Sequence, residues 1–486
     1  MNELTIHLKT KSKIPLYEQI YEYIKSDIQN GRIHCKEKLP STRTLARYLE
    51  VSRSTIELAY EQLLAEGYVE AEPCRGYFVT QIEELYQWKK TGRRSEKKIK
   101  KEKTEYQYDF SPRGIDLDSF PYNVWRKLSK EVLGENQMEL FQAGDAQGEY
   151  EFRETICSYL YQSRGVNCDP DQIIVGAGNE SLLMLLGMMF GGRLKIAFEN
   201  PTYTKAYHLF ENLAFDICTV NMDQKGMRVD ELEKVNANIA YVMPSHQYPL
   251  GIVMPVKRRM ELLKWADQKE DRYVIEDDYD SEFRYKGKPI PSLQGYDANG
   301  KVIYIGTFSR SIAPAIRISY MVLPKKLLRI YKEKCQFLNS TVPRVDQLIV
   351  RNFIHNGYYE RHLNKMRAIY KGRHDKMVSC LKPLLSYCKM SGEHAGVHLL
   401  LTFQEGISER QLLESASRAG VRVYGLSGCD IEEEDKGPAT ILLGYANMKE
   451  DKIKEAADLL KEAWLPLLQK CHDECEIKVN SIVKQQ

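Results

Sequence analysis

The chain has 486 residues, of which 43% are hydrophobic and 28% are charged, and its formal net charge is +3 at pH 7. This composition excludes collagen-like, disordered and coiled-coil proteins, and the length predicts two to four domains of about 150 residues each. The longest apolar run, around 182–190, is too short to cross a bilayer, and the N-terminus has no signal-peptide pattern. We therefore expect a cytoplasmic protein without a membrane partner.

Three helices are predicted at the start of the chain. Pro15 suits the first position of a helix that Asn30 and Gly31 end. Ser41 and Ser52 are expected to cap the second and third helices, and the connection of about four residues between these two is a helix-turn-helix length. The inner face of the third helix is predicted to carry Ile56, Ala59, Tyr60, Leu63 and Leu64.

Two short alternating segments, 68–72 and 77–80, follow these helices and predict a hairpin or wing. Six basic residues lie between Arg32 and Arg53 against two acidic ones, Glu37 and Glu50, so positive charge gathers where a phosphate backbone could bind. The pattern predicts a winged helix-turn-helix domain over residues 1–80. The alternative is a small helical domain that docks on another protein.

The stretch LPSTRTLARYLEVSRSTIELAYEQLLAEGYVEAEPCRGYFV resembles the DNA-binding domain of GntR-family regulators along its whole length. The resemblance implies double-stranded DNA as the partner, with recognition-helix residues at the major groove and its phosphates and two residues at the wing tip. Cys74 and Arg75 take up part of a wing that is usually rich in glycine. The implied DNA-binding residues are Arg43, Ser52, Arg53, Ser54, Thr55, Arg75 and Gly76.

Residues 81–108 are predicted to form a basic linker. Between Lys89 and Lys103 there are nine Lys or Arg against two Glu, a local excess of +7, so the rest of the chain carries a net charge of −4. Such a stretch has too few apolar residues to bury itself, and it repels itself into an extended form that also attracts phosphates.

From Phe110 onward, short β-branched runs alternate with amphipathic segments, which predicts an α/β domain with a mostly parallel sheet over 109–480. The predicted strands are 173–175, 194–198, 239–243, 273–275 and 302–305. Polar or glycine-containing loops follow each strand, and ligands of such sheets bind beyond the carboxyl ends of the strands.

These loops and their surroundings resemble fold-type I pyridoxal-phosphate (PLP) enzymes, and more closely the MocR-type GntR regulators, which join a winged helix to an aminotransferase class I/II-like domain. The matching segments are DAQGEYEFRETICSYLYQSRGV, ENPTY, PSHQYPLG, IEDDYDSEF and GTFSRSIAPAIR. The resemblance implies a large and a small subdomain, and a homodimer with the pocket at the subunit interface.

The resemblance also implies a residue for each part of the cofactor. Asp277 is expected to hold the pyridinium nitrogen, Tyr279 to donate to the phenolic oxygen, and Tyr203 to stack on the ring. The phosphate is expected to bind at a helix N-terminus and a following loop, through Gly178, Asn179, Thr307, Ser309 and Arg317. Taken alone, Asp277 could instead be a strand-end carboxylate and Tyr203 a core aromatic.

Arg310 stands where the resemblance places the lysine that forms the Schiff base. A guanidinium keeps its proton and is a poor nucleophile, so both the covalent bond and the proton shuttle of transamination are lost there. Leu442 stands where many aminotransferases offer an arginine to the substrate carboxylate. No catalytic residue is therefore assigned.

Three hypotheses follow. The first is a transcriptional regulator whose aminotransferase-like domain dimerises and senses a small-molecule effector, with PLP bound non-covalently if at all. The second is an active PLP enzyme that uses another lysine, such as Lys205. The third is a DNA-binding protein whose large domain is only a scaffold, which the retained phosphate residues disfavour.

The eleven cysteines have no regular spacing, which favours reduced thiols over a disulfide framework. Cys471, His472 and Cys475 are the one group of possible metal ligands, and their spacing matches no structural zinc pattern. We expect a solvated tail there and no metal site.

Overall fold

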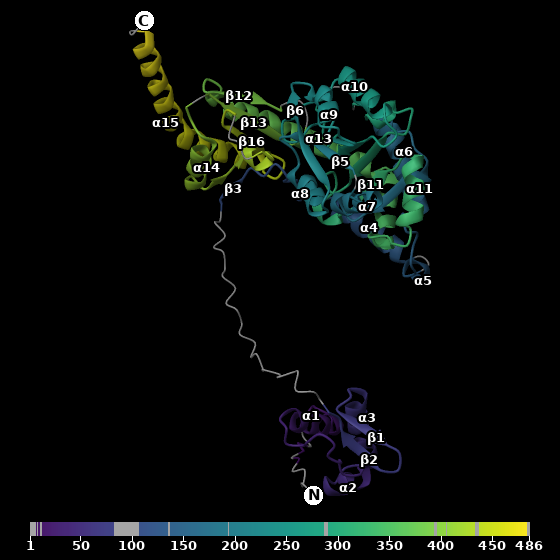
Figure 1. The fold of residues 1–486 in the computed structure, drawn as a ribbon. Coiled ribbons are helices and arrows are strands. Elements are labelled where there is room, and N and C mark those ends of the chain that lie inside the picture. The colour runs from purple at the N-terminus through teal and green to yellow at the C-terminus, as the bar shows by residue number, and fades with distance from the viewer. Residues whose placement is uncertain are drawn as a thin grey trace. The chain divides into compact units, whose positions relative to one another are not determined.

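The computed structural model describes residues 6, 8–9, 12–81, 106–134, 137–192, 194–285, 290–392, 396–404, 406–432 and 437–483, with side chains up to residue 471. The chain divides into two compact units, Met1–Glu102 and Lys103–Gln486 (Figure 1). Most of the predicted linker 81–108 lies outside the described residues, as do the side chains of His472 and Cys475.

The small N-terminal unit has the predicted three helices and hairpin. Its helices are α1 (Leu16–Gln29), α2 (Thr42–Tyr48) and α3 (Arg53–Ala65), and its strands β1 (Val69–Glu72) and β2 (Gly76–Val79) pair antiparallel. Pro15 precedes α1 as its N-cap and is not its first helical residue. Ser41 and Ser52 cap α2 and α3, since their hydroxyls accept from the backbone N–H of Thr44 at 3.1 Å and of Thr55 at 3.2 Å.

The core of this unit forms where the three helices and the hairpin meet. Ile56, Ala59, Tyr60 and Leu63 of α3 are fully buried, as predicted, against apolar residues of α1. The prediction for Leu64 is wrong, because its side chain is 41% exposed. One helical residue is a rotation of about 100°, which carries Leu64 past the edge of the apolar face that Leu63 occupies.

The large unit is built on the predicted, mostly parallel sheet. Its eight strands lie in the order β4-β11-β10-β9-β8-β5-β6-β7. The pairs β10/β9, β9/β8, β8/β5 and β5/β6 are parallel, while β11 runs antiparallel between β10 and β4 and β7 runs antiparallel to β6. The strands are β4 (Ile173–Gly176), β5 (Lys195–Asn200), β6 (Asp216–Asp223), β7 (Gly226–Met227), β8 (Ile239–Val242), β9 (Tyr273–Asp278), β10 (Val302–Thr307) and β11 (Ser319–Val322).

All five predicted strands are confirmed, and β6, β7 and β11 are additional. Alternate residues of each strand enter different apolar clusters, so helices cover both faces of the sheet. Ile174 packs with α7, whereas the neighbouring Val175 packs with α6 and α12. The helices of the unit are α4 (Tyr122–Gly134), α5 (Gln137–Leu140), α6 (Tyr150–Arg164), α7 (Asn179–Phe190), α8 (Thr204–Asn212), α9 (Val229–Lys234), α10 (Val256–Asp267), α11 (Lys325–Lys334), α12 (Arg344–His355), α13 (Tyr358–Leu381), α14 (Glu409–Arg418) and α15 (Glu450–Val483).

A second sheet forms the smaller part of this unit. Its order is β12-β13-β16-β15, and it packs with α13, α14 and α15 around Trp464. These strands are β12 (Cys388–Ser391), β13 (His398–Phe403), β15 (Tyr424–Gly425) and β16 (Thr440–Gly444).

The described chain resumes after the linker at this smaller part. Strand β3 (Tyr108–Asp109) pairs parallel with β14 (Val421–Arg422). Short 3₁₀ helices occur at Pro170–Gln172, Gln294–Tyr296, Pro314–Ile316, Lys382–Leu384 and Leu426–Cys429. Among the described residues, no helix combines the length and apolarity needed to span a membrane.

Candidate functional site

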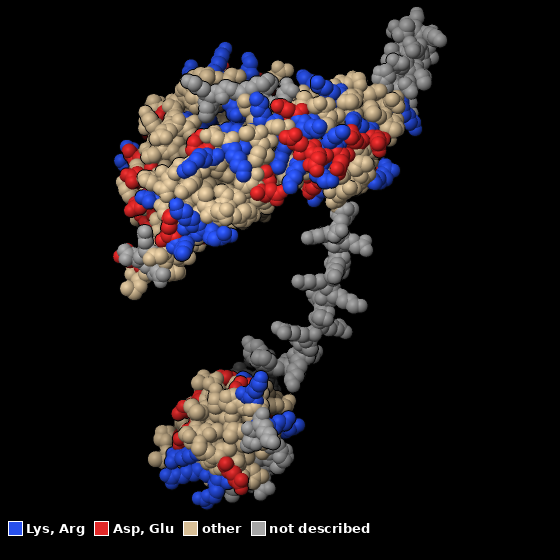
Figure 2. All heavy atoms as spheres, turned by 180° about the vertical axis from the view of Figure 1, so that it is seen from behind, with Lys and Arg blue, Asp and Glu red and all other residues tan. Residues whose placement is uncertain are grey.

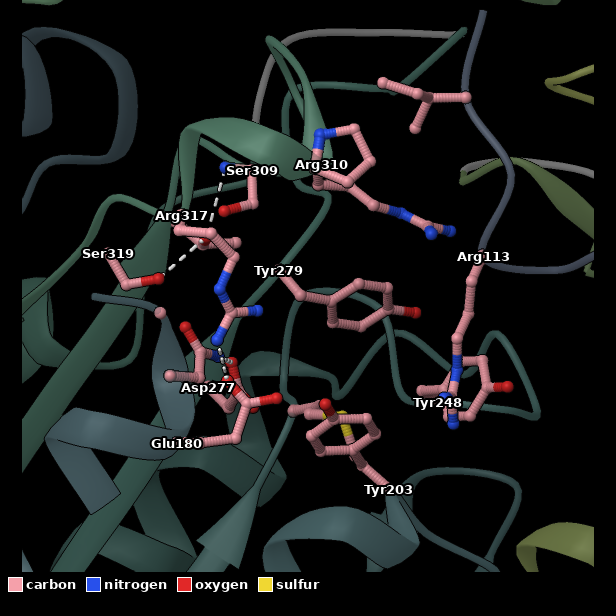
Figure 3. A pocket seen from close by; sticks show the side chains of 16 residues that line it. Arg113, Glu180, Tyr203, Tyr248, Asp277, Tyr279, Ser309, Arg310, Arg317 and Ser319 are labelled. Atoms are coloured by element: carbon pink, nitrogen blue, oxygen red, sulfur yellow. Dashed lines mark hydrogen bonds and ion pairs between the residues drawn. The ribbon is translucent and has the colours of Figure 1, made fainter. Parts of the chain in front are cut away.

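A cavity of about 190 Å³ opens at the carboxyl ends of the parallel strands of the large sheet. The loops after β4, β5, β8, β9 and β10 all contribute side chains to it. It contains all eight residues that the sequence suggested for cofactor binding, together with Arg310 (Figure 3). Its lining is Arg113, Ile115, Gly178, Asn179, Glu180, Tyr203, Met243, Tyr248, Asp277, Tyr279, Thr307, Ser309, Arg310, Pro314, Arg317 and Ser319.

The N-terminus of α7 forms one wall. Gly178 is the N-cap residue, with φ +89°, and a Cβ atom there would lie 2.5 Å from Nη2 of Arg317. Glycine is therefore required both by the backbone and by the close approach of the guanidinium. Gly178 and Asn179 at this helix end line the cavity, and the N-terminus of a helix suits an anion.

Asp277 is the last residue but one of β9; it lines the cavity and is buried. Its carboxylate accepts from Nδ2 of Asn179 at 3.1 Å and from the hydroxyl of Tyr241. Burial raises the pKa of Asp277 to about 7, although both hydrogen bonds act to lower it. Since neither of these hydrogen-bond partners is a cation, the carboxylate fits the cationic ring nitrogen of a pyridine cofactor, which would supply the missing charge.

Hydroxyl groups converge on another part of the cavity. Ser319 Oγ lies 2.8 Å from Thr307 Oγ1, and the backbone N–H of Ser309 donates to Thr307 Oγ1 at 3.2 Å. The Oγ atom of Ser309 and the Oδ1 atom of Asn179 are buried without a hydrogen-bond partner in the described structure. Such unpaired groups are costly unless a ligand pairs them. The Ser309 hydroxyl can donate to an anion, so this wall fits a phosphate, whereas the Asn179 oxygen accepts and needs a donor.

Arg317 joins these hydroxyls from the turn before β11. Its φ is +52°, and its Nη2 atom donates to Oε2 of Glu180 at 2.9 Å and to the Ala177 carbonyl at 3.3 Å. Figure 3 shows Arg317 beside Ser309 on the side of the cavity where Glu180 and Asp277 lie. A guanidinium at this place adds a charged donor to the phosphate-sized wall.

Three tyrosines line the rest of the cavity. The rings of Tyr203 and Tyr248 meet edge to face at 6.4 Å, and the guanidinium of Arg113 lies 5.7 Å from the centre of the Tyr203 ring. Tyr203 thus lines the cavity as well as packing against its neighbours. The hydroxyl of Tyr279 lies 3.0 Å from Nδ1 of His246, and that nitrogen also lies 3.0 Å from Oδ2 of the buried Asp280.

Arg310 enters the cavity after β10. Its Nη2 atom donates to the Pro112 carbonyl at 2.6 Å, its Nε atom is buried without a partner in the described structure, and its guanidinium lies 6.0 Å from the ring centre of Tyr279. No lysine is among the described residues that line the cavity. Lys205 is half exposed, and its Nζ atom lies 3.8 Å from Glu180 Oε1.

The sequence reasoning missed four polar residues of the cavity: Arg113, Glu180, Tyr248 and Ser319. Tyr248 lies within the segment PSHQYPLG and Glu180 directly follows Asn179, so proximity to these residues could have found them. Arg113 lies in a short loop after β3, and no periodicity or motif connects that loop to β10. Leu442, by contrast, is buried within β16 and does not line the cavity.

The residues expected to bind DNA lie on the surface of the small unit. Arg43, Ser52, Arg53 and Ser54 are exposed at the starts of α2 and α3, and Thr55 is half-buried. Figure 2 shows Lys and Arg gathered at the lower end of this unit, the end at which Figure 1 places α2.

The wing residues Arg75 and Gly76 are also exposed. Arg53 pairs with Glu57 at 2.7 Å, and Arg75 pairs with Glu72. Each is an exposed pair, so its carboxylate can be exchanged for a phosphate at little cost. Among the described residues, no group of three possible metal ligands is present.

Comparisons with known proteins identify both units. Residues 16–79 match the family described as "Bacterial regulatory proteins, gntR family", and residues 115–460 match "Aminotransferase class I and II". The chain is 38% identical over 464 residues to the uncharacterized HTH-type transcriptional regulator YdeL of Bacillus subtilis, covering 95% of this chain and 99% of that protein.

Two further comparisons cover most of the chain or its large unit. The probable rhizopine catabolism regulatory protein MocR of Rhizobium meliloti is 28% identical over 475 residues, covering 95% of this chain and 96% of that protein. The crystal structure of a multiple substrate aminotransferase from Thermococcus profundus matches with a TM-score of 0.67 and 26% identity, covering 77% of this chain and 93% of that one.

Proposed function

Because the chain belongs to the MocR-type regulators of the GntR family, which join a winged helix to an aminotransferase class I and II domain, we propose that its large domain binds PLP without a covalent bond and senses a small-molecule effector. One observation carries this proposal. The cavity brings together all the residues suggested for a phosphate and a pyridinium, and Arg310, which stands where the sequence resemblance places the Schiff-base lysine, also lines it.

Each residue suggested for cofactor binding lines the cavity and has a role in this proposal. The phosphate would be held by Ser309, Thr307, Arg317 and the α7 N-terminus at Gly178 and Asn179. Asp277 would pair with the ring nitrogen, Tyr203 would stack on the ring, and Tyr279 would donate to the phenolic oxygen. When bound, the cofactor supplies an aldehyde and an electron-withdrawing ring.

Arg310 cannot perform the work of a lysine in this pocket. Its guanidinium stays protonated and delocalised, so it neither attacks an aldehyde nor carries a proton between atoms of a substrate. Lys205 is held near Glu180 and does not line the cavity. The proposal is therefore a cofactor pocket without transaminase activity.

DNA binding comes from the winged helix of residues 1–80, with the seven residues Arg43, Ser52, Arg53, Ser54, Thr55, Arg75 and Gly76 at the major groove and wing. The segment 81–108 acts as a basic linker, and residues 109–480 dimerise and sense. Two copies of the chain form a homodimer in the cytoplasm and bind paired half-sites. An effector shifts DNA binding only through a difference in its affinity for the two arrangements of the dimer.

The first experiment is a PLP titration of the full-length protein, followed by visible absorption, borohydride reduction and mass spectrometry. The natural protein is expected to bind PLP saturably and to give no adduct, whereas Arg310→Lys gives an adduct at residue 310. Arg329→Lys, an exposed position on α11, is the matched control and gives none there. An adduct on the natural protein would establish the enzyme alternative and identify its lysine, and absence of binding in both forms would refute the cofactor pocket.

A further inference from the structure

The cavity contains two arginines that no carboxylate of the described chain neutralises. Arg113 and Arg310 both line it, and neither has an ion pair within the described residues, whereas Arg317 pairs with Glu180. Figure 3 shows the guanidinium groups of Arg113 and Arg310 on one side of Tyr279 and Arg317 on the other. The cavity thus has a second cationic side, separate from the phosphate wall.

Both guanidinium groups lie on the side of the cavity that Tyr248 also lines. Burial raises the pKa of Tyr248 to about 12, and the charges of Arg113 and Arg310 both act to lower it. The buried Nε atom of Arg310 lacks a partner in the described structure. A guanidinium keeps its proton, so an anionic ligand would both pair these donors and balance their charge.

Arg310 also fastens a segment that we call the entry strap, residues 111–115. The strap is anchored before its start, where the Phe110 N–H donates to the Arg422 carbonyl at 3.0 Å and the Gly444 N–H donates to the Phe110 carbonyl at 2.9 Å. It is anchored after its end by the buried ion pair of Asp116 with Arg373, at 3.0 Å. Between these anchors, Nη2 of Arg310 donates to the Pro112 carbonyl at 2.6 Å.

The hydrogen bond from Arg310 to Pro112 lies close to the linker in the sequence. The strap carries Arg113 and Ile115 into the cavity, and it follows β3 directly, the first strand after the linker. A conformational change of the strap would therefore occur only a few residues, along the sequence, from the segment that joins the large unit to the DNA-binding unit.

We propose that Arg113 and Arg310 form a binding site for a carboxylate of a small molecule, and that its binding draws Arg310 from the Pro112 carbonyl and loosens the entry strap. This inference rests on the proposed function, because it places the effector beside the bound cofactor. A planar carboxylate matches the fork of a guanidinium, and the phosphate donors of Ser309 and Arg317 lie on the other wall. The Nε–H and one Nη2–H of an arginine point the same way. In the proposed site, the guanidinium turns to place both on the carboxylate, and this rotation draws Nη2 from the Pro112 carbonyl.

The test uses full-length protein saturated with PLP and four probes: acetate, succinate, glutarate and adipate. Calorimetry is expected to show saturable binding of at least one carboxylate and none of the matching amide. Arg113→Gln and Arg310→Gln are each expected to weaken that binding roughly tenfold to a hundredfold, the range for a lost hydrogen bond to a charged group. Arg329→Gln, on the exposed face of α11, is the matched control and leaves it unchanged.

Hydrogen exchange of the peptide that spans 110–116 provides the second measurement. The carboxylate is expected to speed exchange of the strap amides in the natural protein. Arg310→Gln is expected to speed it without ligand, and the ligand then adds nothing. Unchanged exchange on ligand binding would overturn the role of the strap even if binding is seen.

The outcomes separate this inference from the proposed function. If PLP binds but no carboxylate does, or if both arginine variants bind the carboxylate as the natural protein does, the arginine site is wrong and the cofactor pocket stands. If PLP itself does not bind, the proposed function fails first. PLP affinity and the far-ultraviolet spectrum of each variant show whether a loss of binding is local or reflects misfolding.

Discussion

The buried carboxyl of Asp277 gives the sharpest prediction for the ligand-free protein. Its pKa is raised from the usual 3.8 to about 7, mainly because it is buried without a cation beside it. At any pH between these two values the unfolded chain has released this proton and the folded chain has kept it. Asp277 therefore does not reduce the free energy of unfolding below pH 3.8. Its destabilising effect grows as the pH rises from 3.8 to about 7 and is constant above pH 7.

The size of this effect follows from the two pKa values. Each unit of pH in this interval is worth about 1.4 kcal/mol, so the full penalty above pH 7 is about 4 kcal/mol. Asp277→Asn removes the charge and keeps a side chain of the same shape for Asn179 and Tyr241. The free energy of unfolding of the variant, relative to that of the natural protein, is expected to be about 3 kcal/mol higher at pH 8 than at pH 5.

The measurement is denaturant unfolding of both proteins without PLP at pH 5 and pH 8. Trp125, Trp265 and Trp464 lie in the large unit, so their fluorescence follows its unfolding. Other buried acids with raised pKa values, such as Glu199 and Glu276, are present in both proteins and cancel in the difference. For PLP binding we expect the natural protein to be favoured, because only the carboxylate of Asp277 can pair with the charged ring nitrogen. Asp277→Asn is expected to bind PLP roughly tenfold to a hundredfold more weakly.

The reasoning is refuted if the stability difference between Asp277→Asn and the natural protein is the same at both pH values. It is also refuted if the variant binds PLP as tightly as the natural protein. The first result means that the carboxyl is not held neutral by burial, and the second means that it does not face the ring nitrogen.

Three further predictions concern single side chains. Ser309→Ala is expected to leave stability unchanged or slightly higher, since the lost Oγ atom is buried and unpaired, and to weaken PLP binding about tenfold, as titration of both proteins would show. Ser52→Ala removes the cap of α3 and is expected to cost about 1 kcal/mol, read from faster hydrogen exchange in that helix. Arg53→Ala is expected to reduce the slope of log K against log salt for DNA binding by about 1, whereas Arg329→Ala leaves the slope unchanged.

The parts of the fold that depend on local sequence patterns could be predicted from the sequence. The caps Ser41 and Ser52 and the five predicted strands each depend on residues close in the chain, and the structure confirms them. Leu64 shows the limit of such patterns at the edge of a helix face. Strand β11 was missed because it runs antiparallel in a sheet whose other central strands follow a strand-helix alternation.

The cavity was predictable only in part, for a different reason. Its floor comes from loops that each follow a strand, so the topology of a parallel sheet brings them to one edge. The Arg113 side comes from the strap after β3, and only tertiary packing of the smaller part of the unit places it there. Neither the pairing of Arg317 with Glu180 nor the bond from Arg310 to Pro112 has a sequence signal, because the partners are 137 and 198 residues apart.

The proposed loss of the Schiff-base lysine changes more than reactivity. A lysine at residue 310 would have one compact charge to give to the cofactor, and its covalent bond would leave the strap without this contact. An arginine keeps its charge and has donors on two sides, so it can hold the Pro112 carbonyl and still offer Nε to the cavity. In the proposed cofactor pocket, Arg310 thus links the bound ligand to the segment that enters the domain.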